Sequence, residues 1–128
     1  MGEAFLMNHG GATMLRAELL WENAGPSNAF EAQTVELDLS IYDVIRIEFF
    51  AVNTAHRIHT IELRNIIGQQ TDLLWYSTYN GKYYSRFAAI RNNGIEFGDG
   101  MQSSNTAVTT HCIPFRIYGV VWSDMRDE

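Results

Sequence analysis

Apolar and charged side chains alternate strictly in three short segments of this chain, and this alternation limits the fold more than any other feature. The segments are TVELDL (34–39), IRIEF (45–49) and IELR (61–64). Successive residues of a β-strand point to opposite faces of a sheet, so each segment predicts a strand with one apolar and one charged side. The stretch 11–23 fits a helical period through Met14, Leu15 and Leu19, and it fits a first strand from Arg16 to Trp21 equally well.

Turn residues separate these segments. Asn80-Gly81 and Asn93-Gly94 are strong hairpin signals, because a two-residue type I′ turn needs positive φ at both positions. The second turn would pair Ile90 with Phe97 and bring Arg91 opposite Glu96 as an ion pair, with a β-bulge near Ala88-Ala89. The segments SIYD (40–43), GDG (98–100) and SSN (103–105) predict further links and turns.

These signals predict an all-β protein with about eight strands in one domain. No helical crossover is long enough for a parallel sheet, so we expect an antiparallel β-sandwich, jelly-roll-like in topology. Residues 1–18 are expected to form an N-terminal arm or linker, residues 19–123 the sandwich and residues 124–128 a polar tail.

The closing segment HCIPFRIYG (111–119) predicts the last strand, with Ile113, Phe115 and Ile117 on its apolar side. Pro114 interrupts it, and proline has no backbone N–H to give to a sheet. Such a residue is tolerated at an edge, at a strand start or at a bulge. We therefore expect this strand to begin at or near an exposed edge.

Composition excludes several classes of partner. The net charge is −6, and phosphate backbones require clustered Lys and Arg, so we expect no nucleic acid as a partner. No apolar stretch reaches the roughly 18 residues of a membrane span, so no membrane insertion is expected. Cys112 is the single cysteine, which excludes an internal disulfide.

The segment WYSTYNGKYYSRF (75–87) holds the densest group of aromatic residues. A two-residue turn at Asn80-Gly81 divides its side chains between two faces. One face carries Trp75, Ser77, Tyr79, Lys82, Tyr84 and Arg86. The other carries Leu74, Tyr76, Thr78, Tyr83, Ser85 and Phe87, and it is the better core candidate.

Rigid rings beside hydrogen-bonding cations suit a sugar ring or a protein partner. The candidate binding residues are Trp75, Tyr79, Lys82, Tyr84 and Arg86. The same face is also open to interpretation as a subunit interface or as ordinary sheet surface.

Metal and catalytic signals are weak. His56 and His59 are three residues apart, which places them on opposite faces of a strand, and His111-Cys112 has the same problem. Asp99 in GDG lacks the alternating acidic pattern of a calcium loop. The sequence has no phosphate loop, nucleophile elbow or H-E-x-x-H motif, although its many carboxylates leave paired acid catalysis open. We expect no enzyme activity, no catalytic residue, no cofactor and no metal.

Three stretches resemble small β-rich modules of bacteriophage and prophage tail-fibre and baseplate-associated proteins. They are LLWENAGPSNAFEAQTVELDLSIYDVIRIEF (19–49), GIEFGDG (94–100) and CIPFRIYGV (112–120). The matching residues of the first stretch are Trp21, Asn23, Pro26, Phe30, Gln33, Thr34, Leu37, Leu39, Ser40 and Tyr42. Gly25 is an extra residue beside the Pro26 turn, and residues 51–93 match only in general character.

This resemblance implies a virion component, assembled in the bacterial cytoplasm and released on lysis. It implies a homo-oligomer, expected to be a trimer, that contacts other tail proteins and attaches to the host through a bacterial surface glycan or another receptor. The matching residues are expected to be structural, so the resemblance assigns no binding residue. The alternatives are a purely structural tail or head-decoration module and a carbohydrate-binding module of a cellular enzyme.

Overall fold

The computed structural model describes residues 14–103 and 105–122, and every regular element in that part of the chain is a β-strand. The strands are β1 (Met14–Glu22), β2 (Gln33–Glu36), β3 (Val44–Val52), β4 (Ala55–Arg64), β5 (Gln70–Ser77), β6 (Lys82–Arg91), β7 (Gly94–Gln102), β8 (Thr106–Ala107) and β9 (His111–Trp122).

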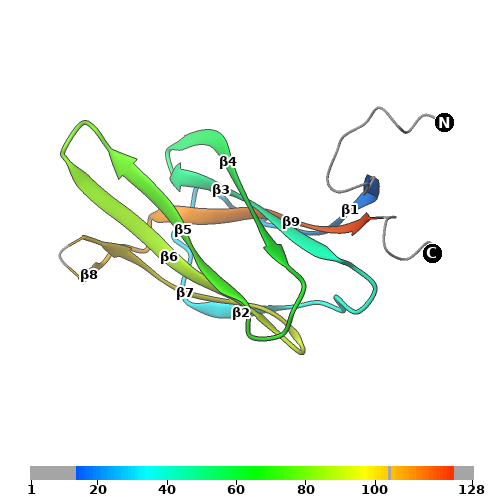
Figure 1. Cartoon of the computed structure of the whole chain (residues 1–128). Coiled ribbons are helices and arrows are strands. Elements are labelled where there is room, and N and C mark those ends of the chain that lie inside the picture. The colour runs from blue at the N-terminus through cyan, green and yellow to red at the C-terminus, as the bar shows by residue number, and fades with distance from the viewer. Residues whose placement is uncertain (1–13, 104, 123–128) are drawn as a thin grey trace.

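Two antiparallel sheets face each other (Figure 1). One has the strand order β1-β9-β3-β4, and the other has the order β2-β7-β6-β5, with β8 paired to β7. The predicted antiparallel β-sandwich is confirmed. The chain passes between the sheets several times: β1, β3, β4 and β9 lie in the first, and β2 and β5 to β8 lie in the second.

The predicted alternation appears most clearly in β3. Ile45, Ile47 and Phe49 are buried in the core between the sheets. On the outer side, Arg46 Nε lies 2.8 Å from Glu62 Oε2 of the neighbouring strand β4. Opposite charges directly across an antiparallel pair stabilise the register that the buried side also requires.

The first strand begins earlier than expected. The stretch that also fitted a helix is β1, and it starts at Met14, so residues 14–18 of the expected arm belong to the sandwich. Tyr42 donates a hydrogen bond to Glu18 and packs over Gly119, where an added Cβ would lie 2.4 Å from the Tyr42 ring. Residues 1–13 and 124–128, the rest of the expected arm and the tail, lie outside the described residues.

The hairpin between β6 and β7 turns one residue earlier than predicted. Its turn residues are Asn92 and Asn93, and Ile90 is paired with Ile95 rather than with Phe97. Gly94 begins β7 with φ of 144°, and a Cβ there would lie 2.0 Å from the Val35 carbonyl oxygen. The close approach of β2 therefore requires glycine at this position.

The predicted ion pair of this hairpin is present despite the changed register. Arg91 Nε lies 2.8 Å from Glu96 Oε1. Glu96 is two residues beyond the residue directly opposite Arg91, and such diagonal neighbours remain within reach of long side chains.

The irregularity predicted near Ala88-Ala89 lies one step earlier, between Arg86 and Ala88. Its extra residue is on β7 rather than on β6. The GDG segment is consequently a bulge within β7, where a turn was predicted. Of the turn predicted at residues 103–105, Ser103 and Asn105 do lie in a turn, and the Asn105 N–H donates to the Gln102 carbonyl at 2.8 Å; residue 104 lies outside the described residues.

Pro114 does not lie at an exposed edge, and that prediction is wrong. Strand β9 is central in its sheet, between β1 and β3, and Pro114 is buried. The proline is tolerated for the two other reasons that the sequence allows: it is near the strand start, and the register with β3 shifts beside it.

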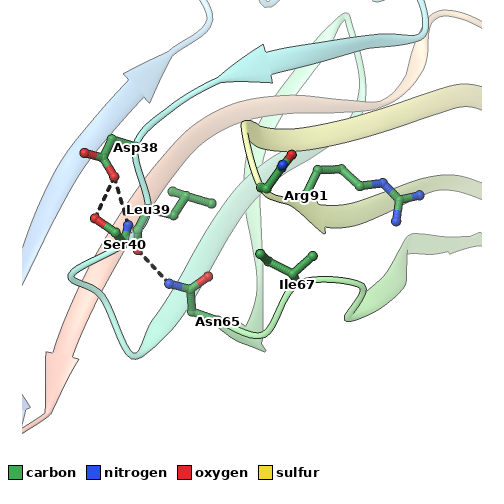
Figure 2. A pocket seen from close by; sticks show the side chains of 7 residues that line it. Asp38, Leu39, Ser40, Asn65, Ile67 and Arg91 are labelled. Atoms are coloured by element: carbon green, nitrogen blue, oxygen red, sulfur yellow. Dashed lines mark hydrogen bonds between the residues drawn. The ribbon is translucent and has the colours of Figure 1, made fainter.

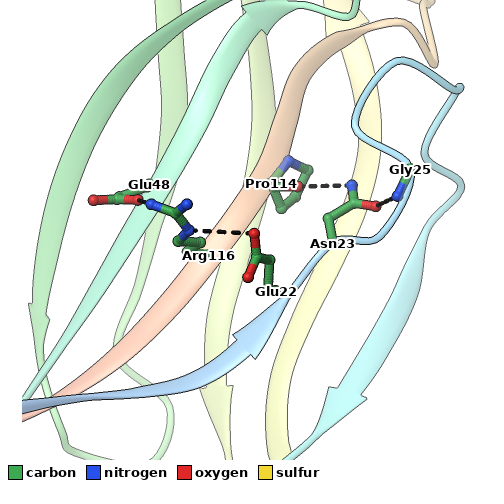
Figure 3. Close-up of polar contacts among 6 residues, drawn as sticks. All are labelled: Glu22, Asn23, Gly25, Glu48, Pro114 and Arg116. Carbon is green, nitrogen blue, oxygen red and sulfur yellow. Dashed lines mark hydrogen bonds and ion pairs between the residues drawn. The ribbon is translucent and has the colours of Figure 1, made fainter.

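The pairing of β1 with β9 ends at Glu22 and Arg116, so β1 does not reach Pro114. Beyond the last β1–β9 pair, the Asn23 side chain makes a hydrogen bond to β9 (Figure 3). Its side-chain Nδ2 donates to the Pro114 carbonyl at 2.9 Å, and its Oδ1 accepts from the Gly25 N–H at 2.8 Å. Arg116, between Glu22 and Glu48, lies 3.5 Å from each carboxylate.

A fully buried arginine joins the two sheets. Arg86 of β6 has no exposed surface, and all its hydrogen bonds go to backbone carbonyls. Its Nε donates to Cys112 at 2.8 Å, Nη1 to Phe30 at 3.0 Å and Gly98 at 2.8 Å, and Nη2 to His111 at 3.0 Å and Thr109 at 3.4 Å. Burial lowers its pKa to about 10, so the guanidinium stays charged at neutral pH.

We expect Arg86→Met to lower the free energy of unfolding by about 3 kcal/mol or more, because it leaves several buried carbonyls without donors. Arg86→Lys should also destabilise, since an ammonium has three donors and no planar fork. Urea unfolding monitored by tryptophan fluorescence measures both losses.

Arg46→Met is the matched control, since it removes an arginine on β3 whose partner is a partly exposed carboxylate. Ion pairs of this kind contribute about 1 kcal/mol or less. Equal losses for the Arg46 and Arg86 variants would contradict a central structural role for Arg86.

Candidate functional site

The aromatic hairpin has a different register from the predicted one. Four residues, 78–81, link β5 to β6, and Ser77 is opposite Lys82. Trp75 is therefore opposite Tyr84, where the two-residue turn had predicted Arg86. The shift is two residues, so each side chain keeps its predicted face, and Trp75 and Tyr84 do lie on the same side of the sheet.

The assignment of the two faces to core and solvent is wrong. Tyr84 and Arg86 are buried, whereas Leu74, Tyr76 and Tyr83, which were expected in the core, are 57%, 47% and 54% exposed. The face with the cation points inward because Arg86 finds its acceptors there, on carbonyls from other parts of the chain.

The five predicted binding residues consequently do not form one surface. Tyr84 and Arg86 lie inside, and Trp75 is half-buried at the margin of the core. Tyr79, in the hairpin link, is 96% exposed, and Lys82 is exposed at the start of β6.

The inner aromatic residues form a stack with a histidine. The Tyr84 ring lies 5.7 Å from the Trp75 ring and 4.0 Å from the His111 ring, measured between centroids. Asn80 donates to the Tyr84 hydroxyl at 2.9 Å, and this bond ties the hairpin tip to the stack. The cluster therefore holds the hairpin against β9 and offers little of Tyr84 to a ligand.

The outer side of the same hairpin presents the residues that sequence reasoning missed. Tyr76 and Tyr83 are directly opposite each other, with ring centroids 4.7 Å apart. Leu74 lies on the same outer side of β5, two residues from Tyr76. We call Leu74, Tyr76 and Tyr83 the tyrosine platform. The same side of β5 also carries the exposed residues Gln70 and Asp72, a polar signal for the outer face that sequence reasoning did not use. On β6 the charged Arg86 lies on the opposite side, so the two strands give conflicting signals.

A surface pocket of about 240 Å³ lies near the turn between β6 and β7, at the other end of the sandwich from the β5–β6 tip (Figures 1 and 2). We call it the end pocket. It is lined by Asp38, Leu39, Ser40, Asn65, Ile67, Arg91 and Asn92. None of these residues was predicted as a site residue, because they come from three separate links of the chain.

His56 and His59 both stack on phenylalanine rings of the core. His56 stacks on Phe50 at 4.5 Å, and its Nε2 lies 3.0 Å from the Asn53 carbonyl and 3.2 Å from Ser27 Oγ. If Nε2 donates to the carbonyl, it cannot also accept the serine proton. His59 stacks on Phe49 at 5.4 Å.

Within residues 14–103 and 105–122, no three His, Cys, Asp or Glu side chains are grouped closely enough to hold a metal ion. The same part of the chain contains no helix with the length and apolar character to cross a membrane. Asp99 is an exposed residue of the β7 bulge.

Three of the residues that carry the resemblance, Phe30, Asn23 and Tyr42, make packing or hydrogen-bond contacts within the fold. Phe30 is buried, meets Phe97 edge-on at 5.7 Å and lies 5.2 Å from the Arg86 guanidinium carbon. Asn23 and Tyr42 make the β9 contacts described above. Comparison of the chain with protein-family models, curated proteins and solved structures finds no match.

The buried stack makes stability depend on pH through His111. Burial lowers its pKa below the ordinary value of 6.5. The unfolded chain therefore takes up a proton more readily than the folded protein as the pH falls. The stability from neutral His111 is complete above about pH 6.5 and is lost below it. We expect the urea midpoint to fall between about pH 7 and pH 5.

In His111→Phe this part of the decline should disappear, because phenylalanine keeps the ring stack and has no proton to bind. His59→Phe is the control and should retain the decline. Urea titrations at several pH values test both variants, and an unchanged decline in His111→Phe would contradict the assignment.

Proposed function

We propose that this chain is a non-enzymatic attachment module of a bacteriophage or prophage tail, and that it binds a glycan on the bacterial surface through the tyrosine platform. The phage assignment rests on the sequence resemblance. The attachment assignment rests on one observation: two tyrosines, each about half exposed, lie in contact on the outer face of a rigid sheet.

The platform suits a sugar for three reasons. Aromatic faces bury the C–H surface of a flat ring, and tyrosine hydroxyls can exchange hydrogen bonds with sugar hydroxyls. The strands hold both rings in place before binding, which reduces the entropy lost on association. Exposed apolar side chains grouped on a sheet mark a contact surface more often than isolated ones do.

A shallow platform implies weak binding at each site. Several copies engaging one surface convert weak single contacts into useful avidity. The proposed homotrimer would supply such copies, with other tail proteins holding them in position. This arrangement matches a virion protein that meets a repeated surface polymer.

The first alternative is a purely structural tail or head-decoration module. One observation favours it: edge strand β1 exposes Met14, Leu15 and Leu19 to 43%, 58% and 49%. Burying this strand against another subunit would remove that apolar surface from water. A carbohydrate-binding module of a cellular enzyme would use the same platform, and neighbouring tail or glycosidase genes distinguish that case.

We expect Tyr76→Ala and Tyr83→Ala each to weaken attachment by about tenfold, which corresponds to the loss of 1–2 kcal/mol from a central aromatic contact. The measurement is retention of fluorescently labelled protein on whole cells and on purified cell-wall glycans from a panel of bacterial species.

Leu19→Ala and Ile58→Ala serve as controls, because they remove exposed apolar side chains from the other sheet. Both should bind as the unaltered protein does. Attachment that survives both tyrosine substitutions would place the receptor elsewhere. Absence of binding to every surface, together with a stable oligomer in solution, would favour the structural alternative.

The trimer is tested separately by light scattering at micromolar concentration. We expect a mass three times that of the 14.6 kDa chain. A monomer mass under those conditions would contradict a trimer formed by this chain alone.

A further inference from the structure

The end pocket is a concave feature of the surface and is separate from the flat tyrosine platform. Asp38, Leu39 and Ser40 come from the link between β2 and β3, Asn65 and Ile67 from the link between β4 and β5, and Arg91 and Asn92 from the β6–β7 hairpin. Loops carried by a rigid scaffold are a common location for binding residues.

Hydrogen bonds hold these three segments in place. Asn65 Nδ2 donates to the Leu39 carbonyl at 2.7 Å and to the Tyr42 carbonyl at 2.8 Å. The Leu37 N–H donates to the Asn93 carbonyl at 3.0 Å, and the Gly68 N–H donates to the Ile90 carbonyl at 2.8 Å. The pocket is therefore formed before a ligand arrives.

Several polar atoms remain available at the pocket. Asp38 Oδ1 accepts from the Ser40 N–H and hydroxyl at 3.1 and 2.7 Å, which leaves Oδ2 without a donor among the described residues. Asn65 Oδ1 accepts no hydrogen bond from that part of the chain and points away from Leu39 (Figure 2). The exposed Asn92 amide offers both a donor and an acceptor.

Apolar surface lies beside these acceptors. Leu39 is buried at the base, and Ile67 is 67% exposed at the rim. In Figure 2 the Arg91 side chain extends with its guanidinium turned away from Asp38 and Leu39. A ligand in the pocket would thus meet carbon surface on one side and oxygen acceptors on the other.

Charge and size narrow the ligand class. The Arg91 guanidinium is already paired with Glu96 at 2.8 Å, and the other charged residue of the lining is the carboxylate Asp38, so an anion is disfavoured. The volume of about 240 Å³ is below the roughly 300–1,000 Å³ of pockets for drug-sized ligands. Acceptors beside a small apolar wall suit a compact ligand with several hydroxyl donors.

We propose that the end pocket binds one ring of a neutral hydroxylated ligand, a single sugar residue, with Asp38, Asn65 and Asn92 taking its hydroxyls and Ile67 covering its carbon face. This site is independent of the tyrosine platform. It would let the protein distinguish one terminal sugar of a glycan from another, which a flat stacking surface cannot do.

The test uses isotope-labelled protein and nuclear magnetic resonance. The probes are methyl α-D-glucopyranoside, methyl β-D-galactopyranoside, N-acetylglucosamine and L-rhamnose, each titrated to millimolar concentration. We expect at least one probe to shift the Ile67 methyl and Asn92 side-chain amide signals in a saturable manner. Ile67→Ser and Asn92→Ala should each raise the Kd by about three- to tenfold, as expected for loss of one contact.

The chain offers matched controls for both substitutions. Ile66→Ser removes a neighbouring isoleucine that is 49% exposed and does not line the pocket. Asn93→Ala removes the other amide of the same turn, whose backbone carbonyl still accepts from Leu37. Both controls should leave the Kd unchanged, and so should Tyr76→Ala, because the platform lies elsewhere.

Three results would overturn the proposal: no probe shifts these signals, inorganic phosphate shifts them more strongly than every sugar, or the control variants weaken binding as much as the pocket variants. Sugar-induced shifts confined to the pocket would support it even if cell attachment fails, so the two proposals are judged separately.

Discussion

The guanidinium of Arg86 is the interaction on which most of the structure depends. It leaves β6 in one sheet and reaches carbonyls at the start of β9 in the other, as well as those of Phe30, Gly98 and Thr109. Cys112 has φ of 51°, in the left-handed region, and its carbonyl receives the Arg86 Nε proton. A charge that is both buried and free of a carboxylate partner is stable only when such dipoles surround it. The fold therefore has to bring distant segments together around this side chain.

The direction of Arg86 determines what the second sheet shows to solvent. Tyr84 lies two residues before it on the same face, so its ring is drawn into the stack with His111. Tyr76 and Tyr83 are then left on the outside. The exposed platform is in this sense a consequence of the polar core. The residues that determine the fold and the residues proposed to bind a receptor belong to opposite faces of one hairpin.

The two proposed binding surfaces use different parts of the architecture. The platform stands on paired strands, whose side chains have fixed spacing, and it can recognise little beyond a flat ring. The end pocket is made by links, whose sequence can vary without disturbing the sheets. Under the two proposals, such a scaffold would keep a general affinity for glycans through the platform while the end pocket sets its specificity.

Local sequence determined the strands, most of the links and the division of side chains between faces, because the two-residue period of a strand is a property of the backbone itself. It also determined the Arg91–Glu96 pair, since that contact tolerates a shift of two residues. Only the tertiary structure decided which face of β5 and β6 is buried, where Pro114 lies, and which links meet at the end pocket. Each of these depends on partners far away in sequence: the carbonyls around Arg86, the ending of β1 beside β9, and the hydrogen bonds between separate links. No local pattern records such partners, because the free energy of burying a group depends on what surrounds it after folding.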